Sequence, residues 1–92
     1  ERQCYTDRPE NIAVEGGMLL LKARKERFAG PARPPEIAER DNPTLVQSHT
    51  SGKVRTIGLH AWRYGRIEAR ARVPAGQGTW PAIWMMPNDP AY

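Results

Sequence analysis

The chain has 92 residues, with 14 Lys and Arg against 10 Asp and Glu, which gives a formal net charge of +4. The basic residues are scattered, which is typical of a solvated surface rather than a nucleic-acid interface. A single cysteine, Cys4, excludes an internal disulfide, and no ligand spacing typical of a zinc site is present. No apolar run approaches the roughly 18 residues of a membrane-spanning helix. We therefore expect no metal, no nucleic acid and no membrane among its partners.

Residues 12–24 predict a β-hairpin. Ile12 and Val14 alternate with polar neighbours, and the first strand ends at a pair of glycines, Gly16 and Gly17. Glycine tolerates the positive φ angles that tight hairpin turns need. The second strand follows as the apolar run that begins at Met18.

Residues 25–44 predict a long, proline-rich surface loop. Proline removes a backbone donor and fixes φ, so we do not expect a regular sheet to run through this segment. Its prolines are Pro31, Pro34, Pro35 and Pro43. A long loop inside a compact domain is usually functional or mobile. The strand pattern resumes over residues 45–58.

Two later segments show the strongest strand patterns. Over residues 64–73, polar and charged side chains alternate with small or apolar ones, and this period of two indicates one wet face and one buried face. Residues 79–86 are apolar on both faces, as expected of a strand inside a sandwich. The sequence therefore predicts an all-β fold, either a sandwich or a barrel.

Carboxylates are poorly placed for sugar hydrolysis in this sequence. Retaining glycosidases use two carboxyl groups about 5 to 5.5 Å apart, and residues two apart on a strand point the same way at about 6.6 Å. The one pair with that spacing, Glu39 and Asp41, falls in the predicted loop. Glu68 lies between Arg66 and Arg70 on one face of a predicted strand, so we interpret it as a charge-paired surface residue.

The tryptophans fit sugar binding better. Trp80 and Trp84 lie on one face of the segment 79–86, and the apolar face of a sugar ring stacks on such side chains. The competing interpretation is that both are core residues, and it stays open for Trp80 in particular.

Four ordered blocks of sequence resemble one protein family. YGRIEAR at 64–70 and VPAGQGTWPAIWMM at 73–86 are similar to the central block of bacterial glycoside hydrolase family 16, and above all to its laminarinase-like endo-β-1,3-glucanases. Three upstream blocks resemble the same family in the same order: YTDRPEN at 5–11, VEGG at 14–17 and TSGKVRT at 50–56. The resemblance covers nearly the whole chain except the proline-rich loop.

The resemblance implies a β-jelly-roll sandwich of two antiparallel sheets with a sugar-binding cleft. It implies retaining hydrolysis of internal β-1,3 or mixed β-1,3/1,4 bonds in a β-glucan, by a protein that is extracellular or periplasmic. Asn11 and Arg55 match positions that bond sugar hydroxyls, and Trp84 matches an aromatic position that lines the same subsites. Trp80 is either a further contact or a core residue. The family also includes members with a structural calcium ion, which nothing here specifies.

The catalytic signature of the family, E-x-D-x-x-E, follows the Trp-rich block, and no residue of 1–92 matches it. We therefore expect residues 1–92 to be the N-terminal part of a single jelly-roll catalytic domain, about half of the sandwich and inactive alone. Open sheet edges favour self-association or pairing with the other half. The alternative is a carbohydrate-binding or oligomerising β-sandwich fragment without catalysis.

Overall fold

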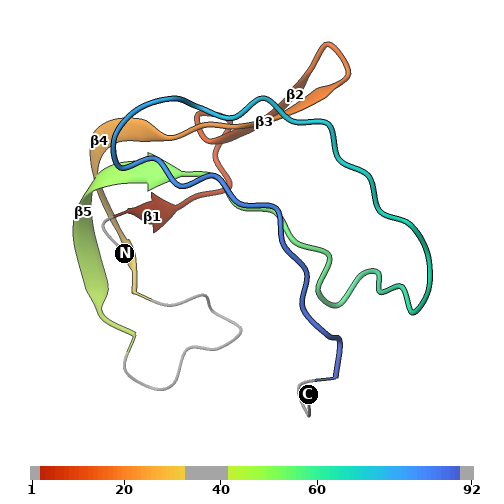
Figure 1. Cartoon of the computed structure of the whole chain (residues 1–92). Coiled ribbons are helices and arrows are strands. Elements are labelled where there is room, and N and C mark those ends of the chain that lie inside the picture. Colours follow the sequence, from red (N-terminus) through yellow and green to blue (C-terminus); the bar gives the residue numbers. More distant parts are fainter. Residues whose placement is uncertain (1–2, 33–41, 90–92) are drawn as a thin grey trace. The chain divides into compact units, whose positions relative to one another are not determined.

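The computed structural model describes residues 3–32 and 42–89, and the chain divides into two compact units, Glu1–Val54 and Arg55–Tyr92. The described residues contain five β-strands and no helix, and all the strands belong to the first unit (Figure 1). The predicted all-β class is confirmed. Within the described ranges, no helix has the length and apolar character needed to cross a bilayer.

The hairpin is made of β2 (Ile12–Glu15) and β3 (Met18–Leu21), which pair antiparallel with Glu15 opposite Met18. Gly16 and Gly17 have φ angles of 57° and 74°. A two-residue turn with positive φ at both positions matches the twist of the strands it joins, and glycine adopts these angles without steric strain. The predicted hairpin is confirmed, although its second strand ends short of residue 24.

The second sheet has three strands in the order β1-β5-β4 (Figure 1). β4 (Arg24–Pro31) pairs antiparallel with β5 (Thr44–Ser51), and the short β1 (Cys4–Tyr5) pairs parallel with β5. This sheet is therefore mixed, rather than antiparallel throughout as the resemblance implied.

The prediction that residues 25–44 form a loop is wrong over 25–31, which belong to β4, and at Thr44, which is the first residue of β5. Pro31 is the last residue of that strand, and β4 lies at an edge of the sheet. Proline is tolerated at such positions because its missing N–H interrupts no central ladder. The rest of the prediction falls largely on residues 33–41, which lie outside the described residues, as do Glu39 and Asp41.

A β-bulge interrupts β4. Lys25 pairs with His49 and Phe28 pairs with Gln47, so two β4 residues, at positions 26 and 27, oppose a single β5 residue. Bulges bend a strand and redirect the side chains at the extra position. The bulge is therefore the local feature that sets where the Glu26 side chain points.

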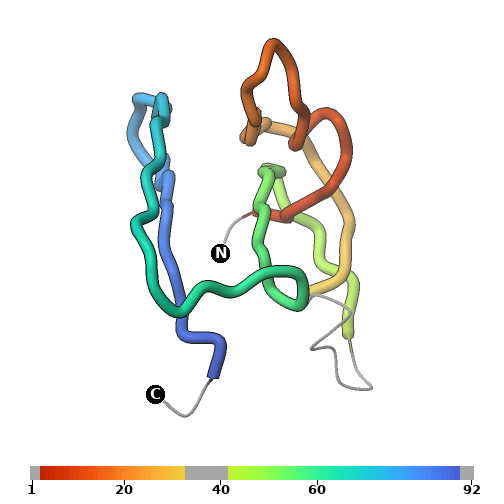
Figure 2. Tube along the Cα trace, turned by 90° about the vertical axis from the view of Figure 1, so that its right-hand side faces the viewer, coloured from red at the N-terminus to blue at the C-terminus, as the bar shows by residue number. Residues whose placement is uncertain are grey.

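The second unit contains no strand between residues 55 and 89, and every residue of 64–73 and 79–86 is exposed. Figure 1 draws no strand arrow over this unit, and Figure 2 shows its chain as extended segments. The two strands and the buried face predicted here are therefore wrong for the described structure. Period-two alternation marks the face that a strand would bury, but a strand also needs a neighbour for its backbone hydrogen bonds. The described residues of the second unit provide no such neighbour.

Polar side chains occupy the most buried positions of the first unit. No hydrophobic side chain among the described residues is fully buried, whereas Asn11 and Thr50 have no exposed surface and Ser51 has 8%. Buried polar groups are tolerated only when hydrogen bonds replace their lost contacts with water. Hydrogen bonds satisfy the side chains of Asn11 and Thr50, whereas the buried Ser51 hydroxyl has none among the described residues. The order of this unit therefore depends on strand ladders and on the hydrogen bonds around Asn11 and Thr50.

Gly52 directly follows β5 and leaves no room for a side chain. A Cβ built there would lie 2.5 Å from the backbone oxygen of Asn11 and 2.9 Å from Cγ1 of Ile12. We predict that Gly52→Ala lowers the free energy of unfolding by about 2 to 3 kcal/mol, because a backbone atom would have to move. Urea unfolding followed by circular dichroism measures this loss.

The matched control is Gly58→Ala, where a Cβ would meet nothing within 4 Å but φ is 75°. Backbone strain alone costs about 1 kcal/mol at such a position. Equal losses from the two substitutions would show that the close approach of Gly52 to Asn11 is not a feature of the folded chain.

Candidate functional site

Asn11 is the centre of a buried hydrogen-bond network in the first unit. Its side-chain Nδ2 donates to the backbone oxygen of Lys22 and to Oγ1 of Thr50, both at 2.9 Å. Its Oδ1 accepts from Oγ1 of Thr6 and from Nη2 of Arg8, the latter at 3.2 Å. A primary amide has two donor hydrogens and two acceptor lone pairs. The hydrogen-bonding capacity of the Asn11 side chain is therefore fully used inside the protein.

The backbone of Asn11 belongs to the same network. Its N–H donates to the Arg8 oxygen at 2.8 Å, and its own oxygen accepts from the Lys22 N–H at 2.7 Å. Lys22 is the residue that follows β3, and Thr50 lies in β5. One residue thus joins the base of the hairpin to the three-stranded sheet.

Glu26 supplies the charge at the other end of this network. Its Oε1 accepts from Thr50 Oγ1 and from Arg8 Nη2, both at 2.5 Å. The Arg8 guanidinium also lies over the Phe28 ring, 4.5 Å from its centroid, in a cation–π contact. The Thr50 hydroxyl links the two ends of the network, because it accepts a hydrogen bond from Asn11 and donates one to Glu26. The cluster is thus a connected network with a charge-assisted end.

The pKa of Glu26 lies below its ordinary value. The main cause is the hydrogen bond from Thr50, followed by the hydrogen bond from Arg8, and burial opposes both. Donors that face a carboxylate stabilise its charged form. Glu26 is therefore held as an anion at neutral pH and is suited to a structural role rather than to giving up a proton.

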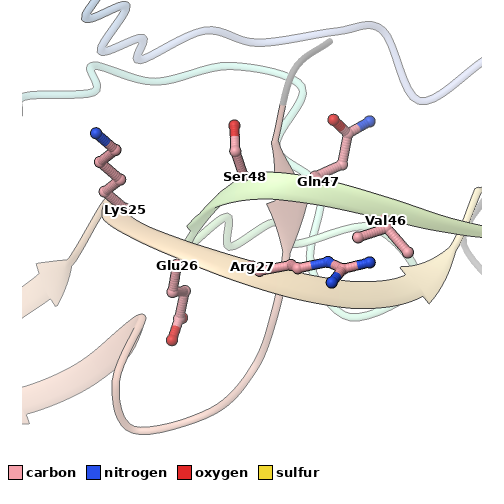
Figure 3. Close-up of a pocket in the computed structure, with 6 residues that line it drawn as sticks. All are labelled: Lys25, Glu26, Arg27, Val46, Gln47 and Ser48. Carbon is pink, nitrogen blue, oxygen red and sulfur yellow. The ribbon is translucent and has the colours of Figure 1, made fainter.

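A surface hollow of about 460 Å³ lies at the β4 bulge. Figure 3 shows the side chains of Lys25 and Ser48 on one side of the strands and the Glu26 side chain on the other. The hollow is lined by Lys25, Glu26, Arg27, Val46, Gln47 and Ser48. It contains no aromatic ring on which a sugar could stack, so we do not assign it to sugar binding.

The sugar contacts expected from the resemblance fall in both units. Asn11 lies in the first unit, and Arg55, Trp80 and Trp84 lie in the second. Trp80 is 92% exposed and Trp84 is 60% exposed. Exposed rings present the flat apolar surface that stacking requires. The sugar-binding roles of these four residues stay predictions.

Glu68, the carboxylate of the segment 64–73, lies at the surface of the second unit. Glu68 forms an ion pair with Arg66 at 2.5 Å, and both side chains are highly exposed. This confirms the interpretation of Glu68 as a charge-paired surface residue. Within the described ranges, no group of three or more His, Cys, Asp or Glu side chains is placed to hold a metal ion.

Sequence reasoning missed the network of Thr6, Arg8, Glu26 and Thr50. The sequence could have indicated two of these residues, because Thr6 and Arg8 belong to the same block, YTDRPEN, as Asn11. It did not indicate Glu26, because this residue was predicted to lie in a loop away from the sheet. Its contact with Thr50 depends on the pairing of β4 with β5, which the prolines argued against.

No protein-family model matches the sequence, and no solved structure matches it. Curated proteins do match. A β-glucanase of Rhodothermus marinus is 42% identical over 93 positions, which cover 100% of this chain and 27% of that protein. Glucan endo-1,3-β-glucosidase A1 of Niallia circulans is 36% identical over 92 positions, covering 100% of this chain and 12% of that enzyme.

A third relative is named for binding rather than cleavage. The β-1,3-glucan-binding protein of Penaeus monodon is 46% identical over 48 positions, which cover 52% of this chain and 13% of that protein. The chain therefore spans between 12% and 27% of the length of these three relatives. Two of the three are named as enzymes that act on β-glucans, and all three names refer to glucan.

We predict that Asn11→Ala lowers the free energy of unfolding by about 3 kcal/mol, because it removes the buried side-chain hydrogen bonds to Thr50, Thr6 and the Lys22 oxygen. Chemical denaturation measures the change. Asn88→Ala is the control, since Asn88 is exposed and surface substitutions usually change stability by about 0.5 kcal/mol or less. A small effect of Asn11→Ala, similar to that of the control, would contradict the network.

The lowered pKa of Glu26 also predicts a pH dependence. A carboxyl group with a depressed folded-state pKa adds stability above its unfolded pKa of about 4.3, and that stability is lost as pH falls through the lower folded-state value. We therefore expect Glu26→Gln to lose less stability than the original chain between pH 6 and pH 3. Urea unfolding at the two pH values measures the difference.

Glu68→Gln is the control for this pH experiment, because its ion pair is highly exposed and such pairs contribute little. Its stability should follow pH in the same way as that of the original chain. If Glu26→Gln also does so, the Glu26 carboxylate makes no pH-dependent contribution and the proposed cause of the acid sensitivity is wrong.

Proposed function

We propose that residues 1–92 are the N-terminal part of an endo-β-1,3-glucanase, or of a mixed-linkage β-glucanase, of the glycoside hydrolase family 16 type. The observation that carries the proposal is the 42% identity to a β-glucanase across the whole chain. The alignment with a glucan endo-1,3-β-glucosidase over the whole chain supports the same assignment. The all-β first unit is consistent with a jelly-roll sandwich.

In this proposal the chain binds glucan and does not cut it. The reaction is hydrolysis with retention, which needs an acid/base and a nucleophilic carboxylate. The family places both in its E-x-D-x-x-E strand, which residues 1–92 do not contain. The substrate is a polymer, so we place the enzyme outside the cell, in the periplasm or beyond it.

The proposed sugar contacts are Trp84 and Trp80 for stacking and Arg55 for hydrogen bonds to hydroxyls. Guanidinium groups donate in a fixed fork, which suits neighbouring hydroxyls on a ring. Asn11 could bond a sugar hydroxyl only by giving up one of its present hydrogen bonds, because its side chain already has four partners. The Arg8 donor at 3.2 Å is the partner that we expect a sugar hydroxyl to replace.

The second candidate function is glucan binding by a protein without catalysis. The similarity to a β-1,3-glucan-binding protein over 48 positions favours it. In either case the large exposed apolar side chains of the second unit, among them Ile83, Met85 and Met86, would support pairing with another copy or with further polypeptide. The two functions differ in whether a catalytic strand belongs to the same protein.

The test is to incubate the chain with laminarin, a β-1,3-glucan, and to measure both binding heat and new reducing ends. We predict binding without release of reducing ends. Trp84→Ala should weaken binding by about threefold to tenfold, the loss expected for one aromatic stacking contact. Val14→Ala, a change at an exposed apolar position of the hairpin, should leave the affinity unchanged.

Dextran, an α-linked glucan, serves as the mismatched polymer and should give no binding heat. Reducing ends released from laminarin by residues 1–92 would contradict the predicted inactivity. Absence of any binding to laminarin or to a mixed-linkage β-glucan would contradict the proposed glucan site itself.

A further inference from the structure

The second unit contains a cavity that is open to solvent and lined by exposed residues, none of them an expected sugar contact. Its volume is about 350 Å³, near the lower end of the range of about 300 to 1,000 Å³ for small-molecule sites. Two segments far apart in sequence form its wall, and both belong to the second unit. The lining residues are Ala61, Trp62, Arg63, Pro87, Asn88 and Asp89.

Trp62 provides the apolar wall of this cavity. Its side chain is 65% exposed, so the indole surface is accessible to a ligand. The His60 ring stacks against it with centroids 5.8 Å apart and an interplanar angle of 26°. His60 is itself held by a turn, in which its N–H donates to the Thr56 oxygen at 3.0 Å. This stacking restrains the indole and lowers the entropy cost of binding to it.

The polar wall of the cavity suits hydroxyl groups. Arg63 offers several N–H donors, Asp89 offers acceptor oxygens, and the Asn88 amide offers both. Arg63 and Asp89 carry opposite formal charges, so this pair of residues favours neither an anionic nor a cationic ligand. A ring with one apolar face and several hydroxyls fits a tryptophan beside mixed donors and acceptors.

We propose that Trp62, Arg63, Asn88 and Asp89 form a further binding site for a neutral sugar ring. The choice of a β-linked glucose unit as that sugar rests on the proposed function. The site is separate from the expected contacts Trp80, Trp84 and Arg55, none of which lines the cavity. A long glucan can therefore contact the chain at a position that the sequence blocks did not indicate.

The test uses the ¹⁵N-labelled chain and the three indole N–H signals, because the chain has three tryptophans. Single Trp→Phe substitutions assign the signals, and an oligosaccharide of β-1,3-linked glucose is then titrated. We expect the Trp62 signal to shift with the sugar. Trp62→Ala and Arg63→Gln should each lower the affinity by about threefold to tenfold. Leu59→Ala, at an exposed apolar residue outside the cavity, should leave the affinity unchanged.

The outcomes separate this site from the proposed function. A shift of the Trp84 signal with a stationary Trp62 signal would overturn the site and leave the glucan-binding proposal standing. Stationary signals from all three tryptophans would overturn both. A Trp62 shift with unchanged affinity in both Trp62→Ala and Arg63→Gln would also overturn the site, because two independent variants test it and Arg63→Gln leaves the indole in place.

Discussion

The first unit depends on a single side chain, Asn11, that is wholly buried and has no hydrogen-bonding capacity left over. Without a fully buried hydrophobic side chain among the described residues, there is little apolar burial to hold the hairpin against the three-stranded sheet. Asn11 joins them by bonding to the residue after β3 and to Thr50 of β5. The bulge in β4 then matters because Glu26, redirected there, completes the network through Thr50 and Arg8.

The second unit differs from the first in having no buried residue, since every described residue from 55 to 89 is exposed, its aromatic and apolar side chains included. Exposed rings are unfavourable for a free-standing chain, but they are what sugar recognition uses. Trp62 lines a cavity together with Arg63, Asn88 and Asp89, and we propose sugar binding as the use of this part of the apolar surface. We propose that the polar network stabilises the first unit and that the exposed aromatic side chains of the second unit bind the glucan.

The sequence correctly predicted the features that depend on neighbouring residues, which are the hairpin turn and the all-β class. The hairpin followed from Gly16 and Gly17, whose positive φ angles the structure contains. The all-β class followed from period-two alternation. The strand through residues 25–31 was missed because the prolines were given too much weight, although Pro31 occupies a strand end. The strands at 64–73 and 79–86 were overpredicted because alternation says nothing about a pairing partner. For the candidate site, the sequence predicted which types of residue bind a sugar. It could not predict the Asn11 network or the Trp62 cavity, because both bring together residues that are distant in sequence.

The most direct measurement is the solvent exchange rate of the side-chain amide protons of Asn11, followed by NMR on the ¹⁵N-labelled chain. The side chain of Asn88 is exposed and supplies an internal reference. Because both Asn11 amide hydrogens donate to buried partners, the account predicts strong protection relative to Asn88 at neutral pH. Exchange of the Asn11 protons at the rate of the Asn88 protons would contradict it, since the hairpin would then not be held to the sheet by this residue.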